Sequence, residues 1–204
     1  MATFNGWQIV IMPSFPAPAG IAWSKVSAVG IRVSGYTGQQ QVYDWQNSWM
    51  KASLSMPPMR PALAMQWIGF LSACQGVANV FQFGDPLALA PRGTGSGTPV
   101  VDGAGQNGTT LATRGWTPSS AVLLAGDWLQ IGYRLYRTVL DVTADAGGRA
   151  VLNLATGVKD APLDGTAITL NSTKGLWRLD SNNPQWSIGG QRMYDIHFDI
   201  VEAV

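Results

Sequence analysis

Apolar side chains recur at every second residue along much of this 204-residue chain, which is the period of a β-strand. Segment 193–201 shows this most clearly, because its alternate positions differ in polarity. Successive side chains of a strand point to opposite faces, so the apolar face of this segment must lie on a sheet built from other parts of the chain. That face carries Tyr194, Ile196, Phe198 and Ile200, and the other face carries Met193, Asp195, His197, Asp199 and Val201.

The N-terminal part of the chain predicts further strands of the same period. Strands are expected at 7–12, 21–34, 41–45 and 48–56, and a fifth is expected at 77–83. Two consecutive prolines end the fourth strand. The residues expected to point inward from the third and fourth strands are Val42, Tyr43, Trp45, Trp49, Leu54 and Met56.

A single helix is predicted between about residues 60 and 75. Pro61 suits its first turn, and Gly76 is placed to end it in the left-handed conformation. Apolar residues recur at helical spacing on one face, so we expect the helix to cover one face of the N-terminal sheet. That face carries Leu63, Trp67, Phe70, Leu71 and Cys74.

The composition changes at Gly84, and residues 84–115 contain eight glycines and three prolines. An irregular stretch of this length inside a compact domain is usually functional or disordered. No Gly-Lys-Ser/Thr follows the glycines, so a phosphate-binding loop is not indicated. We predict that residues 86–119 form an extended arm that becomes ordered against a neighbouring subunit.

Residues 120–182 are predicted to form a small β-barrel domain. Short apolar segments alternate there with Asp-Gly and Gly-Asp turns, and five or six short strands in about 60 residues are typical of a small barrel. The expected strands are 122–124, 128–131, 135–142, 150–154, 167–170 and 176–179.

Charged residues make up only 12% of the chain, against about 25% in an average soluble domain. Such a chain either hides apolar surface against partners or has a neutral surface of Ser, Thr, Asn, Gln and Gly. The formal net charge is +1 and the basic residues are scattered, so no nucleic-acid binding is expected. No apolar stretch reaches the roughly 20 residues of a membrane span, so no membrane association is expected either.

Side chains suited to catalysis or metal binding are few. Cys74 is the only cysteine and is expected to be a buried thiol. His197 is the only histidine; with Asp195 and Asp199 it could supply metal ligands, but neighbouring ligands on one strand face lie roughly 7 Å apart. No Gly-x-Ser-x-Gly elbow precedes His197. We therefore predict that the chain is not an enzyme and binds no metal or cofactor.

The nine tryptophans leave a second function open. Most lie among apolar neighbours and are expected to be core residues or interface anchors. Trp116 and Trp186 have proline and polar neighbours, and are expected to be the most exposed. A carbohydrate-binding module, in which the small barrel and Trp116 or Trp186 would bind the sugar, is the alternative function.

The order of these segments resembles that of phage distal tail proteins. The resemblance covers most of the chain, and most of its motifs are structural. They are Trp45-x-x-x-Trp49, Met56-Pro57-Pro58-Met59-Arg60, Ala64-x-x-Trp67-x-x-Phe70-Leu71, Gly76-x-x-x-x-Phe81, Gly84-Asp85-Pro86, Pro91-Arg92-Gly93, Leu124-x-Gly126-Asp127-x-x-x-Ile131-Gly132-x-x-Leu135-Tyr136 and Tyr194-x-Ile196-x-Phe198-x-x-x-Glu202-Ala203.

The resemblance implies a mainly β fold with a discontinuous ring-forming domain, 1–85 with 183–204. This domain would be a β-sandwich or barrel with one covering helix, and the small barrel of 120–182 would be inserted into it. The family implies a structural virion protein that forms a closed ring, of six copies, at the distal end of the tail tube. Its partners would be the tail tube protein and the hub or receptor-binding tip. The candidate interface residues are Trp116, Trp186, Arg92, Trp45 and Trp49.

Overall fold

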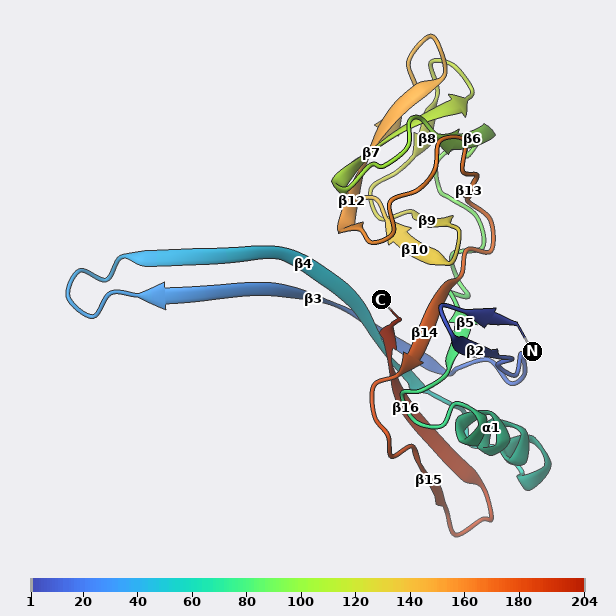
Figure 1. Cartoon of the computed structure of the whole chain (residues 1–204). Coiled ribbons are helices and arrows are strands. Elements are labelled where there is room, and N and C mark those ends of the chain that lie inside the picture. Colours follow the sequence, from blue (N-terminus) through green and yellow to red (C-terminus); the bar gives the residue numbers. More distant parts are fainter. Residues whose placement is uncertain (1, 204) are drawn as a thin grey trace. The chain divides into compact units, whose positions relative to one another are not determined.

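The computed structural model describes residues 2–203 (Figure 1). Over these residues the fold is mainly β with a single helix, which confirms the fold class predicted from the sequence. The chain divides into two compact units. Unit 1 consists of Met1–Ser24, Met50–Gly84 and Lys174–Val204, and unit 2 consists of Lys25–Trp49 and Asp85–Thr173.

The largest sheet has eight strands, in the order β1-β2-β5-β14-β16-β4-β3, with β15 paired to β16. Strands β2 and β5 run parallel, whereas β16 is antiparallel to β14, β15 and β4. Strands from both ends of the chain therefore share one sheet. The strands are β1 (Thr3–Phe4), β2 (Trp7–Val10), β3 (Gly20–Val33), β4 (Gln40–Ser55), β5 (Val80–Phe83), β14 (Gly175–Leu179), β15 (Gln185–Ile188) and β16 (Tyr194–Glu202).

Strand β16 lies inside this sheet, as its alternating pattern predicts. Ile196, Phe198 and Ile200 are buried, whereas His197 and Asp199 are exposed. Phe198 faces Leu54 of β4 across the ladder, and Ile200 faces Leu179 of β14. Strand neighbours on both edges satisfy the backbone, and the apolar face then packs into the core of unit 1.

The helix α1 (Pro61–Ala73) has the position and the apolar face that the sequence predicts. Trp67 and Phe70 are buried, and Phe70 meets Phe81 of β5 edge-on with 5.0 Å between ring centroids. The ring centroids of Trp67 and Phe198 of β16 lie 6.1 Å apart, so the helix covers the sheet at β5 and β16. Gly76 has a φ of +64°, the left-handed conformation expected just after the helix.

Unit 2 contains three small sheets, β10-β9-β13, β11-β8 and β12-β7-β6, around one apolar core. In the described part of the chain these sheets do not close into a barrel, so the predicted small β-barrel is corrected to a group of packed sheets. The strands are β6 (Gly97–Val101), β7 (Gly108–Trp116), β8 (Ala121–Leu123), β9 (Trp128–Ile131), β10 (Arg134–Arg137), β11 (Val142–Thr143), β12 (Arg149–Val158) and β13 (Ile168–Thr169).

The prediction of an extended arm over residues 86–119 is wrong for the two strands it contains, β6 and β7, because both belong to this core. The two strands pair with each other, and β7 also pairs with β12. Gly97 and Gly115 have φ values of +107° and +87°, and a Cβ on either would meet the backbone of the opposite strand. Only glycine tolerates both a positive φ and the lack of space for a Cβ at low cost. The glycines here therefore allow two strands to approach closely.

The unit boundaries differ from the predicted domains at two places. Strand β14 falls in the segment predicted as the inserted domain, but it pairs with β5 and β16 in unit 1. Its Trp177 is buried and donates its indole N–H to the carbonyl of Phe83 at 2.9 Å. Residues 25–49 group with unit 2 and not with the N-terminal domain. A short apolar run predicts a strand, but it does not say which sheet the strand joins.

Candidate functional site

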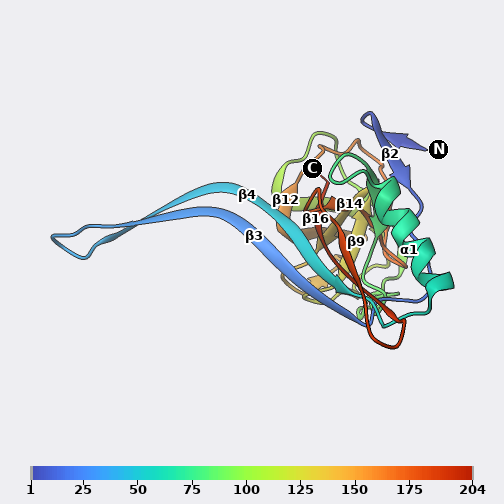
Figure 2. The same ribbon diagram turned by 90° about the horizontal axis from the view of Figure 1, so that it is seen from below.

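Strands β3 and β4 form a long two-stranded ribbon, closed by a loop in which Ser34 donates its N–H to the carbonyl of Gln39 at 2.8 Å (Figures 1 and 2). Strand β16 pairs with β4 only over Lys51–Ser55. We call residues 29–45 the outer hairpin. Every side chain from residue 31 to residue 45 is exposed, on both faces of the outer hairpin.

Both faces of the outer hairpin carry apolar side chains. Val29, Ile31 and Val33 alternate along β3 and so share one face. Trp45 lies on the other face, because a Cβ on Gly30 would stand 2.9 Å from its Cη2 atom. Tyr43 is two residues from Trp45 and shares its face. The exposed fractions are 48% for Val29, 58% for Ile31, 59% for Val33, 60% for Val42, 44% for Tyr43 and 66% for Trp45.

The outer hairpin also has few of the features that protect exposed strands from pairing. Natural edge strands are usually short or carry Lys, Pro or a bulge. Arg32 and Asp44 are the only charged residues between 29 and 45, and the segment has no proline or lysine. At about 3.3 Å per residue, the fourteen residues of β3 span about 45 Å. A long, weakly charged and apolar ribbon of this kind is suited to protein association.

The prediction that Val42, Tyr43 and Trp45 point into a core is therefore wrong, whereas Leu54 and Met56 are buried as predicted. The alternating pattern correctly indicated a strand in both regions. It could not indicate that only the inner end of β4 has a covering layer.

The other candidate interface residues lie in different environments. Trp49 is partly buried and Trp186 is 43% exposed on β15. The Arg92 side chain is 61% exposed and forms an ion pair with Asp127 at 2.9 Å. Trp116 is only 3% exposed, so its predicted exposure is wrong. It packs in the core of unit 2 and donates its indole N–H to the hydroxyl of Thr113 at 2.8 Å.

The burial of Trp116 weakens the carbohydrate-binding alternative. A buried indole cannot stack on a sugar, so Trp186 remains as the sole member of the predicted pair that is open to ligand.

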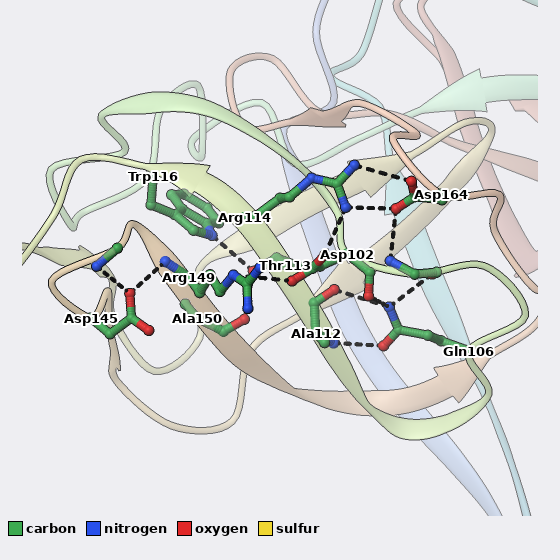
Figure 3. Close-up of polar contacts among 12 residues, drawn as sticks. Asp102, Gln106, Ala112, Thr113, Arg114, Trp116, Asp145, Arg149, Ala150 and Asp164 are labelled. Carbon is green, nitrogen blue, oxygen red and sulfur yellow. Dashed lines mark hydrogen bonds and ion pairs between the residues drawn. The ribbon is translucent and has the colours of Figure 1, made fainter.

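The densest polar cluster is an ion-pair network on unit 2 (Figure 3). Arg114 donates Nη1 to Asp102 Oδ1 at 2.7 Å and to Asp164 Oδ1 at 2.6 Å, and Nη2 to Asp164 Oδ2 at 3.1 Å. Arg149 Nε lies 3.6 Å from Asp102 Oδ2. The bond from Arg114, and a weaker one from the N–H of Gly103, lower the pKa of Asp164 to about 2.

This network joins β7 to the segments that carry Asp102 and Asp164, and it contains no reactive group. Each of its two carboxylates is matched by a guanidinium, and a strongly acidic Asp164 cannot act as a base near neutral pH. The side-chain amide of Gln106 links its own loop to β7 through two hydrogen bonds. Its oxygen accepts the N–H of Ala112 at 2.7 Å, and its nitrogen donates to the carbonyl of Ala112 at 3.0 Å.

No group of three or more His, Cys, Asp or Glu side chains is placed to hold a metal ion among residues 2–203. Asp195, His197 and Asp199 lie along β16 at strand spacing and do not converge. Cys74 is fully buried, and burial raises the pKa of its thiol to about 12. A protonated thiol is a poor nucleophile.

The sequence-based candidates missed Ile31, Val33 and Tyr36, which are exposed on the outer hairpin. A signal for them was present. Two long strand-forming segments flank the short loop that holds Gly35 and Gly38, which predicts one hairpin too long for a small domain to cover.

The sequence matches no known protein-family model, and no curated protein matches it significantly. Within the described residues, no helix is both long and apolar enough to cross a membrane.

Proposed function

We propose that this chain is a structural subunit that associates with copies of itself through the outer hairpin. The observation that carries the proposal is that Val29, Ile31, Val33 and Val42 are exposed on one face of a two-stranded ribbon while Trp45 is exposed on the other. An isolated two-stranded ribbon is at best marginally stable in water, so a partner that covers it would stabilise it.

The energies are of the right size for association. Fully burying a Val, Ile or aromatic side chain contributes about 1.5–3 kcal/mol. The six side chains are 44–66% exposed, so covering the remainder adds about 5–9 kcal/mol in total. Association costs an estimated 4–15 kcal/mol in lost freedom of motion. One hairpin contact is therefore close to balance, and an arrangement in which every subunit makes two such contacts is favoured.

A closed ring is such an arrangement. A hairpin of one subunit that lies on a different surface of the next makes a heterologous contact, and cyclic symmetry repeats it until the ring closes. Each subunit then gives one hairpin and receives one. The resemblance to phage distal tail proteins supports a specific version: a ring of six copies in the virion, between the tail tube and the hub or receptor-binding tip. The chain would act there as a connector and not as an enzyme.

Light scattering coupled to size-exclusion chromatography, with negative-stain imaging, tests the proposal on the full chain at tens of micromolar. We expect a closed ring for the unaltered chain. Ile31→Lys should shift the population to monomers. Val151→Lys is the matched control, because Val151 is also 58% exposed on a strand, β12, but lies outside the hairpin.

Two results would contradict the proposal. A strict monomer at these concentrations would remove self-association altogether. Equal loss of assembly in Ile31→Lys and Val151→Lys would show that added charge, and not the hairpin, is responsible.

A further inference from the structure

A pocket of about 340 Å³ lies in unit 2, between the segment that follows Gly84 and the turn that precedes β9. Its lining includes Leu87, Arg92, Gly126 and Arg137. The volume falls at the lower end of the range seen for small-molecule sites, which begins at about 300 Å³. The pocket is separate from the outer hairpin in sequence, and self-association does not require it.

Asp127, which lines this pocket, is held in place by several hydrogen bonds. It is 4% exposed, and its Oδ2 accepts the backbone N–H groups of Leu124 at 2.8 Å, Arg92 at 3.1 Å and Gly93 at 3.2 Å. Its Oδ1 accepts Nε of Arg92 at 2.9 Å. Burial alone would raise the pKa of Asp127, but these hydrogen bonds outweigh it and lower the pKa. The carboxylate is thus fully used within the wall.

Arg137 is also held in place by contacts within the pocket wall. Its Nε donates to the carbonyl of Gly126 at 2.9 Å, and its guanidinium carbon lies 4.6 Å from the centre of the Trp128 ring. The indole of Trp128 donates in turn to Asp85 Oδ2 at 3.3 Å, while Asp85 Oδ1 accepts the N–H of Leu87. Both acidic residues of the pocket wall therefore have both oxygens engaged by protein donors.

The two guanidinium groups come together at Gly126. A Cβ placed on this residue would lie 3.5 Å from Arg92 Nη2 and 4.0 Å from Arg137 Nε. Arg92 Nη2 donates a hydrogen bond to the carbonyl of Ala125. Within residues 2–203, Arg92 Nη1 and both Nη atoms of Arg137 have no hydrogen-bond partner. Both guanidinium groups thus border Gly126 and have unused donors, although the Nε atom of each is held by a hydrogen bond.

From this geometry we infer that the pocket binds the carboxylate group of a small ligand between Arg92 and Arg137. Guanidinium groups bind carboxylates through paired, planar hydrogen bonds, and fixed Nε edges leave less entropy to lose on binding. A monoanion suits the site better than a phosphate dianion, because Asp85 and Asp127 add two negative charges to the wall. Leu87, which is 95% exposed, and Ala90 supply apolar surface for the body of the ligand.

Isothermal titration calorimetry of the full chain at constant ionic strength tests this inference with three probes. D-glucuronate carries a carboxylate on a sugar ring, D-glucose is the same ring without the carboxylate, and inorganic phosphate is a multivalent oxyanion. We expect glucuronate to bind with a Kd in the millimolar range or tighter, phosphate to bind more weakly, and glucose not to bind.

Variants then locate the site. Arg137→Gln should weaken glucuronate binding at least tenfold, and Arg137→Lys, which keeps the charge but loses the planar fork, should give an intermediate loss. Arg192→Gln is the control, because it removes one charge from an exposed loop of unit 1. Binding of glucuronate no tighter than glucose, tighter binding of phosphate, or equal binding by Arg137→Gln and Arg192→Gln would each overturn the inference. The comparison of the three probes holds even if Arg137→Gln fails to fold.

Discussion

Arg114 forms a bidentate ion pair with Asp164, with 2.6 Å from Nη1 to Oδ1 and 3.1 Å from Nη2 to Oδ2 (Figure 3). The pKa of Asp164 falls from an ordinary 3.8 to about 2 in the folded chain. A carboxyl group with a lowered folded-state pKa stabilises the fold above its unfolded pKa, and this contribution is lost as the pH falls through the folded pKa.

We therefore expect Asp164→Asn to lower the melting temperature by a few degrees at pH 7. The difference from the unaltered chain should shrink between about pH 4 and pH 2, where Asp164 itself becomes protonated. Thermal unfolding followed by circular dichroism across this range measures it. A difference that stays constant down to pH 2 would mean that the ion pair is not its cause.

Substitution of the buried Trp116 and of the exposed Trp186 should lower the free energy of unfolding by very different amounts. Trp116 is 3% exposed within the core of unit 2, so Trp116→Ala should cost about 3–5 kcal/mol. Trp186 is 43% exposed on a peripheral strand, and Trp186→Ala should cost no more than about 1 kcal/mol. Denaturant unfolding of the two variants measures both values. Similar costs would contradict the environments assigned to the two indoles.

Asp127 should be one of the most sensitive polar positions in unit 2. Asp127→Ala leaves the N–H groups of Leu124, Arg92 and Gly93 and the guanidinium of Arg92 without their acceptor. Losing a buried, charged hydrogen-bond acceptor of this kind costs about 3–5 kcal/mol. Asp141→Ala is the control, because its carboxylate accepts the exposed N–H of Ala125 and should cost about 1 kcal/mol. Chemical denaturation compares the two.

The thiol of Cys74 should resist modification in the folded chain. It is fully buried, and its pKa of about 12 leaves almost no thiolate at pH 8. We expect no reaction with a maleimide reagent over an hour at pH 8, followed by full reaction in denaturant. Mass spectrometry counts the labelled chains, and rapid labelling without denaturant would contradict the packing of α1 on its sheet.

The parts of the fold that the sequence predicted well are those in which one local pattern determines the outcome. In α1, the spacing of Trp67 and Phe70 places both on one face, and any covering sheet then buries them. In β16, strict alternation allows only one face to be buried. These features depend on the period of the side chains, which is fully visible in the sequence.

The parts that could not be predicted depend on what lies opposite in space. Trp116 has polar and proline neighbours along the chain, but its indole is buried because Thr113 and the core of unit 2 surround it. Gly97 and Gly115 resemble residues of a loose arm, and only the crossing of two strands shows why glycine is required there. The exposure of Trp45 likewise depends on the absence of a covering layer, which no local pattern records.

The contact between Gly30 and Trp45 gives a last prediction, which rests on the proposed self-association. A side chain at position 30 would collide with the end of the Trp45 ring, but the ring is 66% exposed and can swing away. Gly30→Val should therefore leave the melting temperature of both units nearly unchanged, because it touches neither core. It should instead weaken assembly several-fold, since the displaced indole no longer presents the same apolar surface to a partner. Gly35→Val is the control, because nothing lies within 4 Å of a Cβ at that position. Sedimentation velocity across a concentration series compares the two variants, and an equal shift in both would show that the position of the Trp45 ring does not matter to the contact.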